Sequence, residues 1–167
     1  PSGFAYAQGT RFMLDGSPFY YAGTNCYYLT FKSQEAVDNV FKDAEAMGLK
    51  VIRVWGNLDV GVKTGTTDSE GKPVFTNNND GPGEKDGIYF QYFDKALGKP
   101  VTNFGEDGIK KLDYALYQAE KHGIKLLITF TNYWDAFGGM GQYVKWAEEL
   151  GITGLKKDDF YTNETLK

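Results

Sequence analysis

The chain has 167 residues, enough for one domain with a substantial core, and its apolar and charged fractions of 41% and 24% are average for globular proteins. The net charge of −4, with no basic patch, argues against a nucleic-acid partner, and no apolar run is long enough to cross a membrane. With Cys26 as the one cysteine and His122 as the one histidine, neither an internal disulfide nor a Cys/His metal site is expected. We expect no cofactor, and we expect Cys26 to be a buried small hydrophobic residue.

The first segment, FAYAQGTRFMLDGSPFYYAGTN, is typical of short strands joined by turns. Asp15 and Gly16 suit the positive φ angles of a hairpin turn. The alternation of the flanking residues predicts that four side chains point inward: Phe12, Leu14, Phe19 and Tyr21.

Two later segments repeat one pattern, in which an amphipathic helix stops at a glycine and a short apolar strand follows. The first predicted helix covers about 34–47, with Ser33 as its N-cap and Gly48 as its stop, and the strand VIRVW follows. Its apolar face is formed by Val37, Val40, Phe41, Ala44 and Met47. The second helix is marked by Ile109, Leu112, Leu116 and Ala119, and KLLITF follows it.

A third helix is predicted over about 140–150, with Gly151 as its stop. Helices that alternate with continuous apolar strands indicate an α/β fold with parallel strands joined by crossover helices. Three such units cannot close an eight-stranded barrel, which needs about 250 residues. We therefore expect the chain to be part of a larger protein.

Between the two repeats lies a polar stretch, about 57–104, whose centre is rich in Gly, Asn, Asp and Thr. This composition predicts a long loop and not a second domain. The acidic run NNNDGPGEKDG lacks the spacing of an EF-hand, so we interpret it as a solvated loop. The segment IYFQYFD is expected to form a short strand or an aromatic segment packed on the body.

Each of the three predicted strands ends in a polar group next to aromatic rings. Asn25 precedes Tyr27 and Tyr28, Arg53 precedes Trp55, and Asn132 precedes Tyr133 and Trp134. Ligands bind at the carboxyl ends of parallel strands. A sugar ring has an apolar C–H face and a hydroxyl edge, so aromatic platforms rimmed by amides and a guanidinium suit it.

Other interpretations of these residues stay open. Aromatic rings near strand ends often belong to the core, and Asn at such a position often makes turn hydrogen bonds only. Arg53 interrupts an apolar strand, so we expect a buried guanidinium that supports a carboxylate-bearing site or joins a structural ion pair. His122 is expected to be a residue at the C-terminal end of a helix.

Five segments in order, GTNCYYL, GLKVIRVWG, GIKKLDYALYQAEKHGIKL, TNYWDAFGGMGQYVKWA and DDFYTN, resemble glycoside hydrolase family 5, in its endo-β-1,4-mannanase branch. The resemblance implies a (β/α)₈ TIM barrel. Residues 1–167 would be the N-terminal part of its single catalytic domain, comprising a hairpin and about the first three βα units. It also implies a retaining mechanism with two glutamates, one acid/base and one nucleophile. Both are expected after Lys167, and none in this chain.

When the roles of the family's residues are transferred to matching positions, the resemblance implies that Arg53 supports the nucleophile. It implies that Trp55 lines the glycone side of the cleft and that Trp134 stacks on a more distant sugar. Asn25 and Tyr27 match the first-strand motif, and Asn132 is the candidate amide after the third strand. Tyr28 stands where relatives often have Trp, and the long insertion at 61–87 departs from shorter relatives.

Three carboxylates are candidates for a catalytic role. Glu164 follows Asn163 but lacks the proline and the preceding strand of the family's Asn-Glu-Pro motif, so we reject it. Asp59 and Asp135 follow strands, but the resemblance gives them no catalytic role. We expect both to be site-shaping or structural.

The implied function is endo-acting hydrolysis of internal β-1,4-mannosidic bonds in mannan, glucomannan or galactomannan. The expected partners are a β-mannan and the remainder of the barrel, in the same or a second chain, with neither nucleic acid nor membrane. A polymer substrate implies an extracellular location. The alternatives are a related β-glucanase or transglycosylase on the same barrel, or a non-catalytic carbohydrate-binding fragment.

Overall fold

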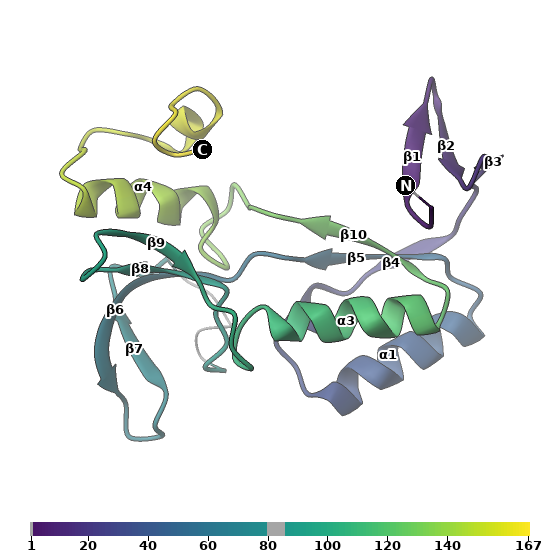
Figure 1. Ribbon diagram of the computed structural model, residues 1–167, viewed down its shortest axis with the longest axis horizontal. Coiled ribbons are helices and arrows are strands. Elements are labelled where there is room, and N and C mark those ends of the chain that lie inside the picture. Colours follow the sequence, from purple (N-terminus) through teal and green to yellow (C-terminus); the bar gives the residue numbers. More distant parts are fainter. Residues whose placement is uncertain (1, 80–85) are drawn as a thin grey trace. The chain divides into compact units, whose positions relative to one another are not determined.

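The computed structural model describes residues 2–79 and 86–167, whose elements Figure 1 shows in chain order. The helices are α1 (Gln34–Ala46), α3 (Lys110–Lys121) and α4 (Gly139–Glu149), with the 3₁₀ helices η1 (Tyr27–Thr30) and η2 (Lys157–Tyr161). The strands are β1 (Ala5–Gln8), β2 (Arg11–Leu14), β3 (Ser17–Pro18), β4 (Gly23–Asn25), β5 (Val51–Trp55), β6 (Asp59–Thr67), β7 (Pro73–Thr76), β8 (Gln91–Asp94), β9 (Lys99–Thr102) and β10 (Lys125–Thr129). Contacts divide the chain into a first unit, Pro1–Val54 with Asp113–Ile128, and a second unit, Trp55–Leu112 with Thr129–Lys167.

A parallel sheet in the order β10–β5–β4 organises the first unit. β4 and β5 pair in parallel, with Asn25 opposite Arg53. At the start of β10 the Lys125 amide donates to the Lys50 carbonyl at 2.8 Å, and the arrows of β5 and β10 point the same way in Figure 1. Parallel strands of this kind need crossover connections, which α1 and α3 supply. The predicted βα repeat is therefore confirmed.

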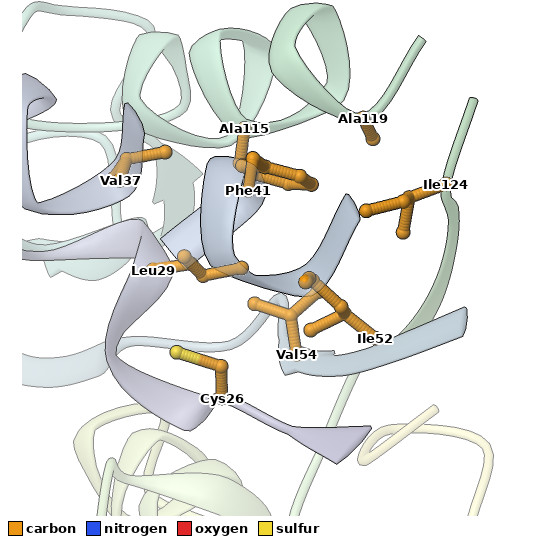
Figure 2. Packing of buried hydrophobic residues seen from close by; sticks show 10 residues of the cluster. Cys26, Leu29, Val37, Phe41, Ile52, Val54, Ala115, Ala119 and Ile124 are labelled. Atoms are coloured by element: carbon orange, nitrogen blue, oxygen red, sulfur yellow. The ribbon is translucent and has the colours of Figure 1, made fainter. Parts of the chain in front are cut away.

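The helices pack on one face of this sheet. Ile52 and Val54 of β5 are both 0% exposed. Figure 2 shows them pointing toward Phe41 of α1, whose ring lies beside Ala115 of α3. The other buried members of this core are Cys26, Leu29, Val37, Ala44, Ala119 and Ile124. Because side chains alternate along a strand, the burial of Ile52 and Val54 leaves Val51 and Arg53 on the opposite face.

The helix boundaries follow local signals. The Ser33 hydroxyl accepts a hydrogen bond from the Ala36 amide at 3.2 Å, which caps α1 as predicted, and Gly48 ends it with a φ of +72°. Two expected core residues are wrong: Met47 is 74% exposed because it follows the last helical residue, and Leu116 is 43% exposed. In α3 the buried face runs through Ala115 and Ala119 instead, four residues apart.

Polar contacts also join α1 to α3. Asp38 accepts hydrogen bonds from the Tyr114 hydroxyl at 2.6 Å and from the Gln118 amide at 2.7 Å. His122 follows the last residue of α3, as expected, and its Nδ1 lies 2.6 Å from Glu45. Its ring stacks on Phe41. His122 is thus part of the packing between the two helices.

The N-terminal hairpin forms a separate antiparallel sheet, β1–β2–β3. Asp15 and Gly16 have the predicted positive φ angles, 48° and 83°, because this turn matches the twist of its strands. The expectation that Phe12 and Tyr21 point into a core is wrong for the described chain, where they are 53% and 44% exposed. The hairpin is short, and its aromatic side chains contact one another, as Phe19 does Tyr21.

The stretch 57–104 is not the long loop that its composition predicted. It forms a four-stranded sheet in the order β7–β6–β8–β9. Phe75 and Tyr89 meet at 4.9 Å on this sheet, and the Lys63 ammonium lies 5.0 Å from the Tyr92 ring centroid. Only the first half of β6 is buried, and its second half is a polar ribbon paired with β7, which hid the strand from sequence patterns.

Helix α4 is the predicted third helix and packs on β6 through Trp146. This side chain is 2% exposed, and its Nε1 donates to the Val60 carbonyl at 3.0 Å. The segment 77–79 is bound to the same helix rather than solvated: the Asn79 amide donates to Gln142, which donates to the Asn77 carbonyl. Residues 80–85 of the acidic run lie outside the described residues.

Candidate functional site

In the first unit, Asn25 and Arg53 share one sheet face. They are register partners on β4 and β5, and both side chains are exposed. The expectation of a buried guanidinium is wrong for the described residues, within which the Arg53 side chain has no ion pair or hydrogen bond. Alternation places it opposite Ile52 and Val54, on the face that the helices do not cover. An amide and a cation therefore stand side by side on an open sheet face.

Tyr27 and Tyr28 follow β4 as part of η1. The Tyr27 ring is 49% exposed and meets Tyr28 edge to face at 5.5 Å. The next residue, Leu29, is 1% exposed and anchors η1 in the core. Tyr27 thus presents a ring near the carboxyl end of β4, from a backbone fixed by its buried neighbour.

In the second unit, Trp55 at the end of β5 is held by Phe137. Their ring centroids are 4.2 Å apart at an interplanar angle of 87°, a close edge-to-face contact. Phe137, Gly138 and Gly139 have successive positive φ angles of 63°, 85° and 58°. A Cβ on Gly138 would lie 2.3 Å from the Asp59 carbonyl oxygen, so this tight turn requires glycine there.

The side-chain amide of Asn132 folds the loop that follows β10. Its Nδ2 donates to the Ala136 carbonyl at 3.2 Å, and its Oδ1 accepts from the Trp134 amide at 3.2 Å. The Asn132 carbonyl also accepts from the Met140 amide at 2.8 Å. These are the turn bonds that asparagine commonly makes, and a contact of Asn132 with substrate stays a prediction.

Trp134 projects from this loop and is 76% exposed. Its neighbours are fixed by Lys157, which pairs with Asp135 at 3.0 Å and lies over the Tyr133 ring. A hydrogen bond to Asp158 raises the pKa of the Tyr133 hydroxyl. An exposed indole on a braced loop can offer a flat face to a ligand.

Two buried polar residues, Asn57 and Asp59, lie beneath this loop. Asn57 is 1% exposed and its Nδ2 donates to the Phe137 carbonyl at 3.4 Å, while Asp59 is 2% exposed. Burial raises the pKa of Asp59 to about 8, and the Gly139 amide and Tyr143 hydroxyl nearby oppose that shift in part. From its place after a strand, the sequence predicted Asp59 to be site-shaping or structural, but nothing in the pattern showed that it is buried.

Glu164, the third carboxylate considered, makes a local contact. Glu164 is exposed and pairs with Lys167 at 3.0 Å, three residues along the chain. Within the described residues no three His, Cys, Asp or Glu side chains gather as a metal site would require. In the same part of the chain, no helix has both the length and the apolar character needed to cross a bilayer.

The predicted site residues therefore fall into two groups. Asn25, Tyr27 and Arg53 lie in the first unit, and Trp55, Asn132 and Trp134 lie in the second. Within each group the residues lie in the later part of a strand or in the segment that follows it, as expected for a parallel α/β fold. That both groups line one groove stays a prediction.

The sequence model of the family described as "GH family 5 beta-mannosidase-like" matches residues 2–164. The chain belongs to this family of glycoside hydrolases. The expected family and fold class are thereby confirmed, since the structural neighbours are (β/α)₈ barrel enzymes of the same family.

Individual proteins are also similar to this chain over nearly its whole length. Mannan endo-1,4-β-mannosidase F of Aspergillus clavatus is 40% identical over 165 residues, and mannan endo-1,4-β-mannosidase A of Emericella nidulans is 38% identical over 165 residues. Each match covers 98% of this chain but only 32% and 36% of the relatives. The crystal structure of the endo-1,4-β-mannanase from Rhizomucor miehei superimposes with a TM-score of 0.73 at 35% identity. It covers 98% of this chain, which spans 38% of that protein.

Proposed function

We propose that the protein containing this chain is an endo-acting retaining glycoside hydrolase that cleaves internal β-1,4-mannosidic bonds of mannan, glucomannan or galactomannan. The observation that carries the proposal is the match over nearly the whole chain to proteins named mannan endo-1,4-β-mannosidases. The site geometry supports it, because an aromatic ring braced at a strand end and an exposed indole suit neutral sugars.

The role of this segment is to bind sugar and support the catalytic carboxylates. Trp55 and Trp134 supply flat apolar faces, and Asn25 and Tyr27 supply hydrogen-bonding groups. Arg53 projects from β5 with no acidic partner among the described residues. A guanidinium so placed would hold a nearby carboxylate ionised. The two glutamates that perform the displacement would come from the remainder of the barrel.

Because the proposed substrate is a polymer that lies outside cells, we also propose an extracellular location and a role in polysaccharide degradation. Detection of the protein in culture supernatant, with a cytosolic marker absent, tests the location. Retention of the protein with intact cells would overturn it.

The activity is tested on the complete protein with galactomannan and with a soluble cellulose derivative in parallel. An endo-acting mannanase lowers the viscosity of galactomannan well before much reducing sugar is released. Proton NMR of the first product should show the β anomer, as retention requires. Preference for the cellulose derivative would assign a β-glucanase. Longer oligosaccharides formed from mannohexaose would assign a transglycosylase, and binding without cleavage would leave a carbohydrate-binding role.

A further inference from the structure

Asp59 is the first residue of β6, and its carboxyl group is buried without a well-formed hydrogen bond among the described residues. A buried carboxyl of this kind is costly, which raises the question of what it contributes. The proposed catalysis does not use Asp59, which lies below the loop and is 2% exposed.

The surroundings of Asp59 are the start of α4 and the turn before it. Gly138, the N-cap residue of α4, has no side chain to satisfy the first helical amides. The Asp59 carboxyl lies near the Gly139 amide and near the hydroxyl of Tyr143, four residues later on the same helical face. Asp59 therefore stands where a capping side chain is missing.

The backbone of Asp59 shapes the same turn. Its amide donates to the Phe137 carbonyl at 3.1 Å, and its carbonyl lies where a Cβ on Gly138 would collide. Phe137 in turn meets Trp55 edge to face. A continuous chain of contacts thus leads from Asp59 through the turn to the Trp55 ring.

We propose that Asp59 is a positioning residue for sugar binding: it packs from β6 against the start of α4, seats the turn 137–139 and thereby fixes Trp55 through Phe137. This inference rests on the proposed function, because it assigns Asp59 a part in that site. Asp59 touches no sugar. It acts through Phe137, and its loss would let the turn and the Trp55 ring move together.

The protonation state of Asp59 follows from the groups that face it. From α4 the titratable neighbour is Tyr143, whose hydroxyl also accepts from Gln91 of β8 at 3.4 Å. The turn contributes backbone only. The charged side chains of this region have other partners: Lys145 donates to the Asn78 carbonyl, and Asp135 pairs with Lys157.

Because no cation among residues 2–79 and 86–167 faces Asp59, its anion has to be solvated by opening the turn. Burial raises the pKa of this group to about 8, so Asp59 is neutral in acid and ionises in mild alkali. The close packing of the neutral acid beneath the turn should therefore be lost at alkaline pH, because the anion needs water. Asparagine at this position would keep the shape and cannot ionise.

The test compares wild type, Asp59→Asn, Asp59→Ala and the control Asp68→Asn in the complete protein. Asp68 is an exposed turn carboxyl at the far end of the same β6 ribbon. KM and kcat for mannohexaose are measured at about pH 6 and about pH 9, on either side of the Asp59 transition. We expect Asp59→Ala to raise KM about tenfold at the lower pH, and Asp59→Asn to leave it within about twofold.

The KM measurements at the higher pH distinguish a positioning role of Asp59 from a general loss of stability. Wild type should show a severalfold higher KM at the higher pH, whereas Asp59→Asn should not, and Asp68→Asn should follow wild type. The proposal is overturned if folded Asp59→Ala keeps the wild-type KM, or if Asp59→Asn rises in KM with pH as wild type does. Should Asp59→Ala not fold, the Asp59→Asn arm decides alone.

A spectroscopic readout keeps failure of this inference distinct from failure of the proposed function. Near-ultraviolet circular dichroism reports the packing of tryptophan without substrate. The wild-type tryptophan bands should weaken between the two pH values, and those of Asp59→Asn should persist. A protein that shows this change but cleaves no mannan refutes the proposed function only. If the protein cleaves mannan but neither Asp59 variant changes its tryptophan bands or its KM, only the positioning role is refuted.

Discussion

Asn25 and Arg53 lie opposite each other on the parallel strands β4 and β5, so their side chains emerge on the same face of the sheet. That face is turned away from Ile52 and Val54, which are fully buried under the helices. The Cys26 amide donates to the Arg53 carbonyl at 2.9 Å, which ties the end of β4 to β5. The backbone that presents both groups is therefore fixed, while the groups themselves remain accessible.

Replacing Arg53 should separate its role in the reaction from any role in stability. We expect Arg53→Ala to lower kcat about 100-fold, the usual effect of removing a group that stabilises charge in an active site. Within the described residues the exposed side chain has no ion pair, so any change in melting temperature would report its contacts with the rest of the barrel. Arg11→Ala, the exposed arginine of the hairpin, is the control. A large loss of stability with unchanged kcat would reassign Arg53 to the fold.

The Trp55 ring should contribute to binding as a flat apolar surface whose orientation is fixed by its contact with Phe137. Trp55→Ala should lower kcat/KM for mannohexaose by about tenfold, equivalent to roughly 1.4 kcal/mol. Trp55→Phe should recover most of this loss because it keeps a flat apolar ring. Wild-type kinetics in Trp55→Ala would remove this residue from the site.

Trp134 tests whether the loop after β10 extends the binding surface. At 76% exposure its removal should leave the melting temperature unchanged. We expect Trp134→Ala to raise KM severalfold for mannohexaose but not for mannotriose, because the resemblance places this ring at a distant sugar. Phe104→Ala, at an equally exposed ring of the second unit, is the matched control. Equal effects on both substrates would place Trp134 nearer the cleavage point.

Local patterns predicted the parts of the fold whose burial repeats regularly. Helical spacing and a capping serine located α1, and apolar runs located β5 and β10. The exposure of Arg53 was missed because the strand was treated as buried on both faces. Alternation along β5 places Arg53 on the face opposite Ile52 and Val54. Its exposure follows from this only once it is known which face the helices cover.

The sheet within 57–104 could not be read from its sequence for a different reason. β6 pairs with β7 on one side and with the distant β8 on the other, and its register shifts in both pairings. Glycine and threonine along its second half remove the alternation that marks a strand. The burial of Asp59 has the same origin, since it depends on α4, about 80 residues later, packing over β6.

Trp146 should be the main anchor of α4 on this sheet. It is 2% exposed, it donates to the Val60 carbonyl, and it meets Tyr143 edge to face at 5.0 Å. Trp146→Ala should lower the free energy of unfolding by about 3–5 kcal/mol, and Trp146→Phe by less. Urea denaturation of the complete protein measures both. A loss under about 1 kcal/mol in Trp146→Ala would show that α4 is held by other contacts.

The free energy of unfolding should depend on pH through the ionisation of Asp59. Burial raises its pKa from 3.8 to about 8 in the folded state, so between these values the folded chain holds a proton that the unfolded chain has released. Stability from this group is therefore complete below about pH 4 and falls as pH rises, by up to about 1.4 kcal/mol per pH unit, until the folded pKa is passed. Asp59→Asn removes this component, so its stability should fall less steeply between about pH 5 and about pH 8. Urea denaturation across that range, with Asp68→Asn as control, measures the difference. Equal slopes in wild type and Asp59→Asn would mean that Asp59 ionises as an ordinary carboxyl despite its burial.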